Sequence, residues 1–300
     1  MPRVLLFVNT VNTTDLKSSF FPKLYENCFQ FANVNYLTIA VLPRITDAMH
    51  LDDILGLIYS KAREILLSSG NFEIKVDVLF NKPKDFYTTQ TWDCVFIPKD
   101  LEHSFKEKFL RVEFYSFSGT EQIETLSKDE PKYTENFYKV SALGGTFDHI
   151  HDGHKILLSV AAFLTSKKLI IGITHDKLLV NKKYKEFLQP IEVRESNVKN
   201  FLNLIKPGLK IELVRIKDVC GPTGTAPDIE ALVVSRETVK GGETVNNTRQ
   251  AHGLCPLKIF VVNVLGGREE DGWKEKVSST HLRELEQLKQ DHCNKILHPK

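Results

Sequence analysis

The sequence predicts an α/β protein of two domains, the second of which is built on a Rossmann-like, mostly parallel sheet. Short apolar runs rich in β-branched and aromatic residues alternate with helix-like stretches along most of the 300 residues, as strands alternate with helices in α/β folds. One polar segment interrupts this alternation and divides the chain. In the second half the spacing is that of right-handed βαβ units, so we expect ligand-binding residues at the carboxyl ends of its strands.

Residues 1–117 are expected to form the first α/β domain. Its clearest helix is predicted at residues 51–67, which are long and apolar enough for a packed helix. Its strands are expected at residues 4–8, 36–42, 73–80, 94–98 and 112–117. This half contains no glycine-rich phosphate loop and no histidine or cysteine cluster. Its sequence therefore indicates no chemistry.

Residues 118–136 are expected to be a linker, because they are polar and carry no apolar period. Residues 137–300 then form the second domain. Its strands are expected at residues 139–143, 169–174, 211–216, 231–235 and 257–264, and its helices at 153–164, 190–205, 244–252 and 279–289. Pro190 suits the first turn of the second of these helices, since proline lacks only an amide that would have no partner there.

Composition excludes several classes of protein. The formal net charge is +2 without a basic tail or stripe, so nucleic acid is not expected as a partner. The longest apolar runs are far shorter than the roughly 20 residues that span a bilayer. The five cysteines are scattered and odd in number, which favours reduced thiols over a disulfide framework. With no evident targeting leader, we expect a cytosolic protein outside the membrane.

Residues 144–154 read Gly-Gly-Thr-Phe-Asp-His-Ile-His-Asp-Gly-His and directly follow a predicted strand. Gly144 and Gly145 lack a Cβ, so the backbone there can turn sharply and approach a ligand closely. Thr146 offers a hydroxyl, and the amides of Thr146 and Phe147 can point at a phosphate. This segment is predicted to bind a nucleotide.

His151 and His154 are three residues apart at the start of a predicted helix, so they share one face beside the amino-terminal amides. Two imidazoles and the positive end of a helix dipole suit a phosphate group. The alternative is a zinc site formed with His149. We expect no metal site here, because no thiol is nearby and His149 is expected to point away from the other two histidines.

A second candidate anion site lies at residues 276–283, Lys-Val-Ser-Ser-Thr-His-Leu-Arg. Ser278, Ser279 and Thr280 open the last predicted helix, where hydroxyls and amides can hold phosphate, and Lys276 and Arg283 add charge. An ordinary helix cap with basic surface residues is the alternative for this segment alone.

The two segments together resemble the nucleotidyltransferase superfamily, which carries a Gly-Gly-x-Phe-Asp and His-x-Gly-His segment early and an Ile-Ser-Ser-Thr-like segment late. Within it, residues 221–228 and 233–242 are most similar to the eukaryotic phosphopantetheine adenylyltransferases. One departure is Arg236, where the animal form carries an acidic residue, so that Arg236 either contacts phosphate or is simply a surface residue. No Walker-type kinase motif is present in the sequence.

The resemblance implies transfer of an adenylyl group from ATP, supplied with Mg²⁺, to 4′-phosphopantetheine, giving dephospho-coenzyme A and pyrophosphate. It assigns His154 to the α-phosphate, His151 to the triphosphate, and Thr146 with the Phe147 amide to the reacting phosphate. The serines would hold the β- and γ-phosphates. Related enzymes place a bridging lysine where Lys182 lies, with Lys183 close behind.

Three alternatives stay open. A cytidylyltransferase or a nicotinate mononucleotide adenylyltransferase would share the first motif. A pathway scaffold with reduced catalysis is a third reading. The first domain is also expected to dock other enzymes of coenzyme A synthesis, because it carries no evident chemistry of its own.

Overall fold

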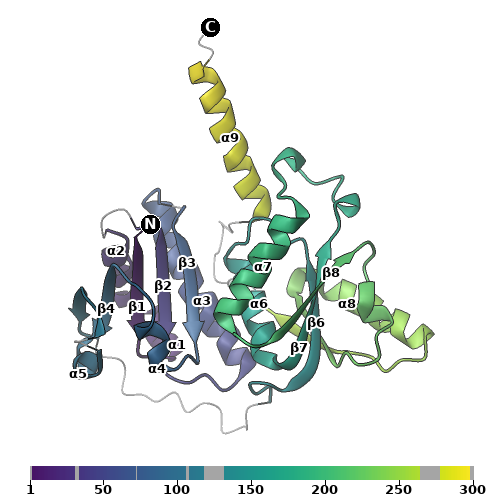
Figure 1. Ribbon diagram of the computed structural model, residues 1–300, viewed down its shortest axis with the longest axis horizontal. Coiled ribbons are helices and arrows are strands. Elements are labelled where there is room, and N and C mark those ends of the chain that lie inside the picture. Colours follow the sequence, from purple (N-terminus) through teal and green to yellow (C-terminus); the bar gives the residue numbers. More distant parts are fainter. Residues whose placement is uncertain are drawn as a thin grey trace. The chain divides into compact units, whose positions relative to one another are not determined.

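The computed structural model describes residues 2–30, 34–71, 73–105, 108–117, 132–263 and 278–297. The chain divides into two compact units, Met1–Tyr133 and Thr134–Lys300, and Figure 1 shows a parallel sheet in each. Most of the expected linker lies outside the described residues. Among the described residues no helix is long and apolar enough to cross a membrane.

The first unit is a five-stranded parallel sheet in the order β3-β2-β1-β4-β5. Its strands are β1 Arg3–Val8, β2 Tyr36–Val41, β3 Lys75–Phe80, β4 Cys94–Pro98 and β5 Val112–Tyr115. Its helices are α1 Thr13–Lys17, α2 Phe20–Phe29, α3 Ala48–Ser68, α4 Lys84–Thr88 and α5 Glu102–Phe105. Each of the five expected strands is present, and the helix expected at residues 51–67 is α3, longer by a few residues at its start.

The second unit is also a five-stranded parallel sheet, in the order β10-β9-β6-β7-β8. Its strands are β6 Tyr138–Gly145, β7 Thr165–Thr174, β8 Lys210–Ile216, β9 Ala231–Ser235 and β10 Lys258–Val262. Its helices are α6 Asp152–Leu164, α7 Ile191–Ile205, α8 Val239–Ala251 and α9 Ser279–Leu297. Short 3₁₀ turns follow the strands: η3 Asp176–Leu178, η4 Lys185–Phe187, η5 Gly221–Gly224 and η6 Arg236–Thr238.

Strand β6 is central and pairs with both β7 and β9, so the chain crosses from one side of β6 to the other between β8 and β9. At such a switch point the loops after neighbouring strands turn in opposite directions and leave a crevice at the carboxyl edge. Helix α6 supports that edge: almost all of its residues are buried. The α/β class and the Rossmann-like parallel sheet expected from the sequence are confirmed.

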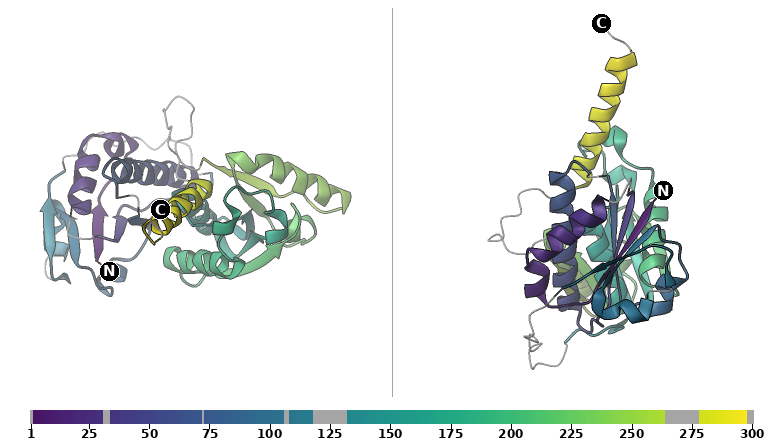
Figure 2. Two further views of the ribbon diagram at one scale, coloured as in Figure 1. Left: turned by 90° about the horizontal axis from the view of Figure 1, so that it is seen from above. Right: turned by 90° about the vertical axis from the view of Figure 1, so that its left-hand side faces the viewer.

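Three elements of the second unit differ from expectation by four residues or more at one end. Strand β7 begins at Thr165 instead of residue 169, because the polar run Thr-Ser-Lys-Lys pairs with β6 although it lacks apolar residues. Helix α8 begins at Val239 instead of residue 244, through two glycines. A Cβ at Gly242 would lie 3.0 Å from the Ile259 side chain, so glycine permits close packing on β10. Helix α9 runs to Leu297 and projects from the second unit (Figure 2).

Candidate nucleotide-binding site

A cavity of about 850 Å³ opens at the carboxyl edge of the second sheet. Its wall is built by the loops after β6, β7, β8 and β9, together with the starts of α6 and α9. The expected site residues that line it are Gly144, Gly145, Thr146, Phe147, His151, His154, Lys182, Ser278, Ser279, Thr280 and Arg283. The fold thus brings together two segments that are far apart in the sequence. Lys183 is not among the residues that line the cavity.

The loop after β6 turns at Phe147 and His149, not at the glycines. Both residues have a left-handed backbone conformation, with φ of 52° and 44°, which residues other than glycine seldom adopt. Gly144 and Gly145 still belong to the strand. A Cβ on Gly145 would lie 3.1 Å from the Phe147 ring, so the missing side chain at Gly145 makes room for that buried ring.

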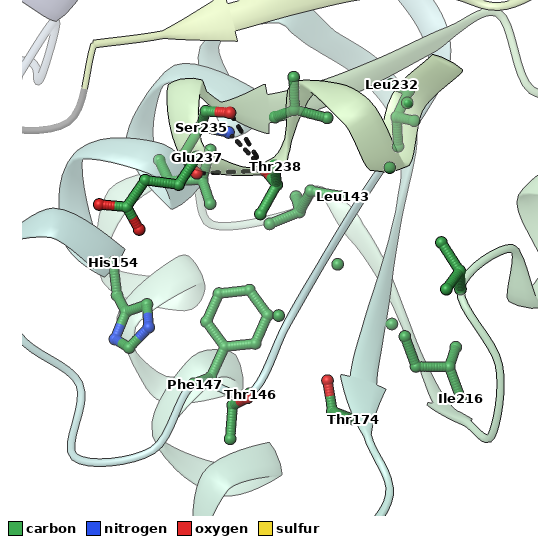
Figure 3. Close-up of a pocket in the computed structure, with 18 of the residues that line it drawn as sticks. Leu143, Thr146, Phe147, His154, Thr174, Ile216, Leu232, Ser235, Glu237 and Thr238 are labelled. Atoms are coloured by element: carbon green, nitrogen blue, oxygen red, sulfur yellow. Dashed lines mark hydrogen bonds between the residues drawn. The ribbon is translucent and has the colours of Figure 1, made fainter. Parts of the chain in front are cut away.

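The two motif histidines form a stacked pair at the start of α6. His151 occupies the N-cap position with an extended backbone, and the ring centroids of His151 and His154 are 3.9 Å apart at an interplanar angle of 30°. The Phe147 ring packs against His154 at 5.2 Å (Figure 3). The first intrahelical bond runs from the Lys155 amide to the His151 carbonyl, 3.0 Å. The earlier amides therefore direct the positive helix end toward the cavity.

His154 is neutral at neutral pH in this arrangement. Burial, and to a smaller extent the neighbouring His151, lower the pKa of His154 well below its ordinary value. Its Nδ1 is buried and has no hydrogen-bond partner among the described residues. An anion that enters the cavity would favour the charged imidazolium and offset this penalty.

The start of α9 is fastened to the loop after β6 by Asp148. Arg283 is buried and its guanidinium donates to the Asp148 carboxylate, to the Lys183 carbonyl at 3.0 Å and to the Thr280 hydroxyl at 3.1 Å. The Ser279 hydroxyl donates to the Asp148 carbonyl at 2.8 Å. The sequence assigned Arg283 to nucleotide binding. In the structure its charge is neutralised by Asp148, so its evident task is to hold the two segments together.

Ser278 lies at the cavity wall and also caps α9. Its hydroxyl accepts the His281 amide at 3.3 Å, and its carbonyl accepts the Leu282 amide at 3.0 Å. The helix cap expected as one alternative is therefore present, and the same residue lies at the cavity wall, where a phosphate site stays a prediction. Lys276 lies outside the described residues.

The segment between β7 and α7 brings Lys182 to the cavity. The Lys182 amide donates to the Leu179 carbonyl at 3.1 Å, and the next residues are tied to α9, since the Tyr184 hydroxyl donates to Glu284 at 3.1 Å. Lys182 lines the cavity, whereas Lys183 does not, and the Lys183 carbonyl accepts a hydrogen bond from Arg283. This favours Lys182 over Lys183 as the lysine that reaches a ligand.

His149 turns away from the other two histidines, as expected. Its Nε2 lies 2.9 Å from the Phe187 carbonyl and its Nδ1 lies 3.6 Å from Glu286. Within the described parts of the chain no group of three histidine, cysteine or carboxylate side chains is placed to hold a metal ion.

Arg236, for which the sequence left a phosphate contact or a surface position open, lines the cavity after β9, and its Nε donates to the Asn263 side chain at 2.7 Å. Glu237 beside it also lines the cavity and was not singled out from the sequence. Figure 3 shows Glu237 extending toward the side of the cavity where His154 lies. Apolar side chains also line the cavity, namely Ile170, Ile216, Val219, Pro222, Leu232, Val234 and Val245. Only some of these, such as Ile216 at the end of β8, lie at the carboxyl end of a strand, where the predicted parallel sheet gave a signal.

Fold and site together define the class of protein, a nucleotidyltransferase: a model of the cytidylyltransferase-like family matches residues 142–285. The phosphopantetheine adenylyltransferase of Saccharomyces cerevisiae is 47% identical over 251 residues, 83% of this chain and 82% of the yeast protein. The chain therefore belongs to the phosphopantetheine adenylyltransferase family.

Two shorter members of that family are also similar to this chain. The phosphopantetheine adenylyltransferase of Pyrobaculum aerophilum is 36% identical over 144 residues, 48% of this chain and 88% of that protein. That of Pyrococcus abyssi is 37% identical over 146 residues, 49% of this chain and 89% of that protein. The family expected from the sequence is confirmed.

The lowered pKa of His154 predicts a pH dependence of stability. Below its ordinary pKa of about 6.5, the unfolded chain binds a proton that the folded site resists. The free energy of unfolding of the ligand-free protein should therefore fall as the pH drops from 7.5 to 5.5. Most of the fall should occur below 6.5, where the unfolded chain takes up the proton. Urea denaturation at several pH values measures this.

His154→Gln should remove this part of the pH dependence, and His103→Gln, at an exposed position in the first unit, should leave it as in the original protein. If the free energy of unfolding of the His154→Gln variant changed with pH as steeply as that of the original protein, His154 would not be the source of the pH dependence.

Proposed function

We propose that this protein transfers the adenylyl group of ATP to 4′-phosphopantetheine, forming dephospho-coenzyme A and pyrophosphate. The observation that carries the proposal is one cavity with two helix starts at its wall, that of α6 with His151 and His154 and that of α9 with Ser278. Two sites for anions in one cavity suit a reaction between two phosphorylated substrates. Membership of the phosphopantetheine adenylyltransferase family supports the same donor and acceptor.

The reaction needs position and charge more than proton transfer. The acceptor phosphate is already an anion, so it can attack the α-phosphate in line without a covalent enzyme intermediate. Donors that face the growing negative charge then lower the barrier. Among the described residues at the cavity, Lys182, Arg236 and the two motif histidines supply cationic or N–H groups, and Glu237 is the single carboxylate.

We assign the reacting α-phosphate to His154 and the triphosphate to His151 and the α9 start. His154 is well placed for the first task, because its imidazole is buried and becomes a stronger donor when negative charge develops beside it. Thr146 and the Phe147 amide, in the loop after β6, orient the acceptor phosphate. Lys182 bridges the two substrates as a compact positive charge.

The apolar side chains of the cavity support phosphopantetheine as the acceptor. Ile216, Val219, Pro222 and Val245 line the same cavity as the proposed phosphate-binding loops, and burying a long arm against such side chains contributes about 25 cal/mol per Å². A short acceptor such as phosphocholine would leave those side chains exposed. This observation favours the phosphopantetheine reaction over the cytidylyltransferase alternative.

Mg²⁺ is proposed to enter with ATP, held by phosphate oxygens and water. Glu237 is the one carboxylate among the described residues that line the cavity, which fits an ion delivered by the nucleotide. A cytosolic location stays a prediction.

Pyrophosphate release tests the reaction. The purified protein should release pyrophosphate from ATP with 4′-phosphopantetheine, and much more slowly with CTP or with phosphocholine or nicotinate mononucleotide as acceptor. His154→Ala should lower turnover by at least about a hundredfold with the fold intact, the size typical of losing a positioned electrostatic group. Turnover of a folded His154→Ala variant at the original rate would remove His154 from the mechanism.

The two neighbouring lysines provide a matched pair. Lys182→Ala should lower turnover by about tenfold or more, because a charge at the transferring phosphate is lost. Lys183→Ala removes an equal charge one residue away, from a side chain outside the cavity lining, and should change turnover less than about threefold. Steady-state kinetics with saturating ATP distinguishes them, and equal losses would contradict the assignment of Lys182.

We also propose that the first unit docks other enzymes of coenzyme A synthesis. It has a core of its own, and the described residues that line the cavity all come from the second unit. Affinity capture with the full chain should retain such enzymes, whereas a chain that lacks residues 1–135 should lose them. Identical captured proteins would contradict the docking role.

A further inference from the structure

A buried arginine lies behind the phosphate-binding loop. Arg194, near the start of α7, has no exposed surface. Its Nη1 donates to the carbonyls of Thr146 at 3.0 Å and Thr174 at 2.8 Å, and its Nε donates to the Gln189 carbonyl at 3.0 Å. Its Nη2 is paired with the Asp176 carboxylate. Arg194 does not line the cavity, so any effect on a ligand there must act through the groups that it holds.

The bond to Thr146 fixes the direction of the next amide. A trans peptide is planar, with its carbonyl and its N–H on opposite sides. The Thr146 carbonyl points into the interior, toward Arg194. The N–H of Phe147 belongs to the same peptide and must point the other way. Since Thr146 and Phe147 line the cavity and Arg194 does not, that N–H is directed to the cavity side of the loop.

This orientation is not the one that the backbone prefers. Phe147 has a φ of 52°, a region that costs free energy for residues other than glycine. Rotating the peptide between Thr146 and Phe147 by about half a turn would move φ of Phe147 toward its ordinary negative range. The same rotation would turn a carbonyl oxygen toward an incoming phosphate. Arg194 opposes this rotation, because it would lose its bond to Thr146.

We propose that Arg194 is a positioning residue, which holds the Thr146–Phe147 peptide with its N–H toward the acceptor phosphate. The three carbonyls come from the loop after β6, the end of β7 and the segment before α7. One guanidinium therefore aligns the Phe147 amide with the segment that carries Lys182. This role rests on the proposed adenylyl transfer.

Arg194→Lys tests the role while it keeps a positive charge. A lysine ammonium cannot span these four acceptors, so kcat should fall by about tenfold to a hundredfold, as when one preorganised donor is lost. KM for ATP should change by less than about threefold, because the sites assigned to the triphosphate are untouched. Arg215→Lys is the matched control. Arg215, in β8, is paired with Glu192 and Glu195 of α7, the helix that carries Arg194, and in this variant kcat should stay within about twofold.

A measurement on the original protein covers the case in which Arg194→Lys does not fold. With ¹⁵N-phenylalanine labelling, the Phe147 amide resonance should shift when 4′-phosphopantetheine is added without ATP. In folded Arg194→Lys the shift should be lost or reduced. An unmoved Phe147 amide at saturating 4′-phosphopantetheine, or an original kcat in folded Arg194→Lys, would overturn the positioning role. Failure of the original protein to release pyrophosphate would instead overturn the proposed function.

Discussion

The ion pair between Asp148 and Arg283 is the contact on which the geometry of the second unit depends. Both side chains are buried, and they join segments that are 135 residues apart. Removing one partner of such a pair typically costs about 3–5 kcal/mol, because the remaining charge stays desolvated. Asp148 also accepts the Gln189 amide at 2.9 Å. One carboxylate thus fixes the loop after β6, the segment before α7 and the start of α9.

Buried guanidinium groups also hold other loops of the second unit. Arg249 donates to the carbonyls of Cys255, Thr223 and Ala226 at 2.7–2.8 Å, much as Arg194 holds the carbonyls near β6 and β7. Irregular loops carry carbonyls that no neighbouring strand satisfies, and a buried carbonyl without a donor is costly. A planar guanidinium with five N–H groups can serve several at once. The loops can therefore be rigid without being apolar, as a site for anions requires.

The sequence predicted the strands and the contiguous motif in the loop after β6. It did not predict contacts between residues that are far apart in the chain. The strands were recognisable because buried parallel strands read as continuous apolar runs, and the residues of the β6 loop were recognisable because they are contiguous. Helix α2 was not predicted, although Phe21, Leu24, Tyr25 and Cys28 are buried with a helical period, since the segment is short. Arg194 could not be found, because its partners come from three separate loops. Arg283 was placed at the site, but its pairing with Asp148 was not predicted, since no local pattern shows a contact between residues 135 positions apart.

The late position of α9 has a consequence for synthesis of the chain. Asp148 emerges from the ribosome long before Arg283 does, so a nascent second unit can complete its sheet through β10 while Asp148 still lacks its partner. Ser278 and Arg283 join the cavity wall only when α9 is released and docks. During translation the wall of the cavity is therefore completed last at α9, after the loop that follows β6 and the start of α6 have been made.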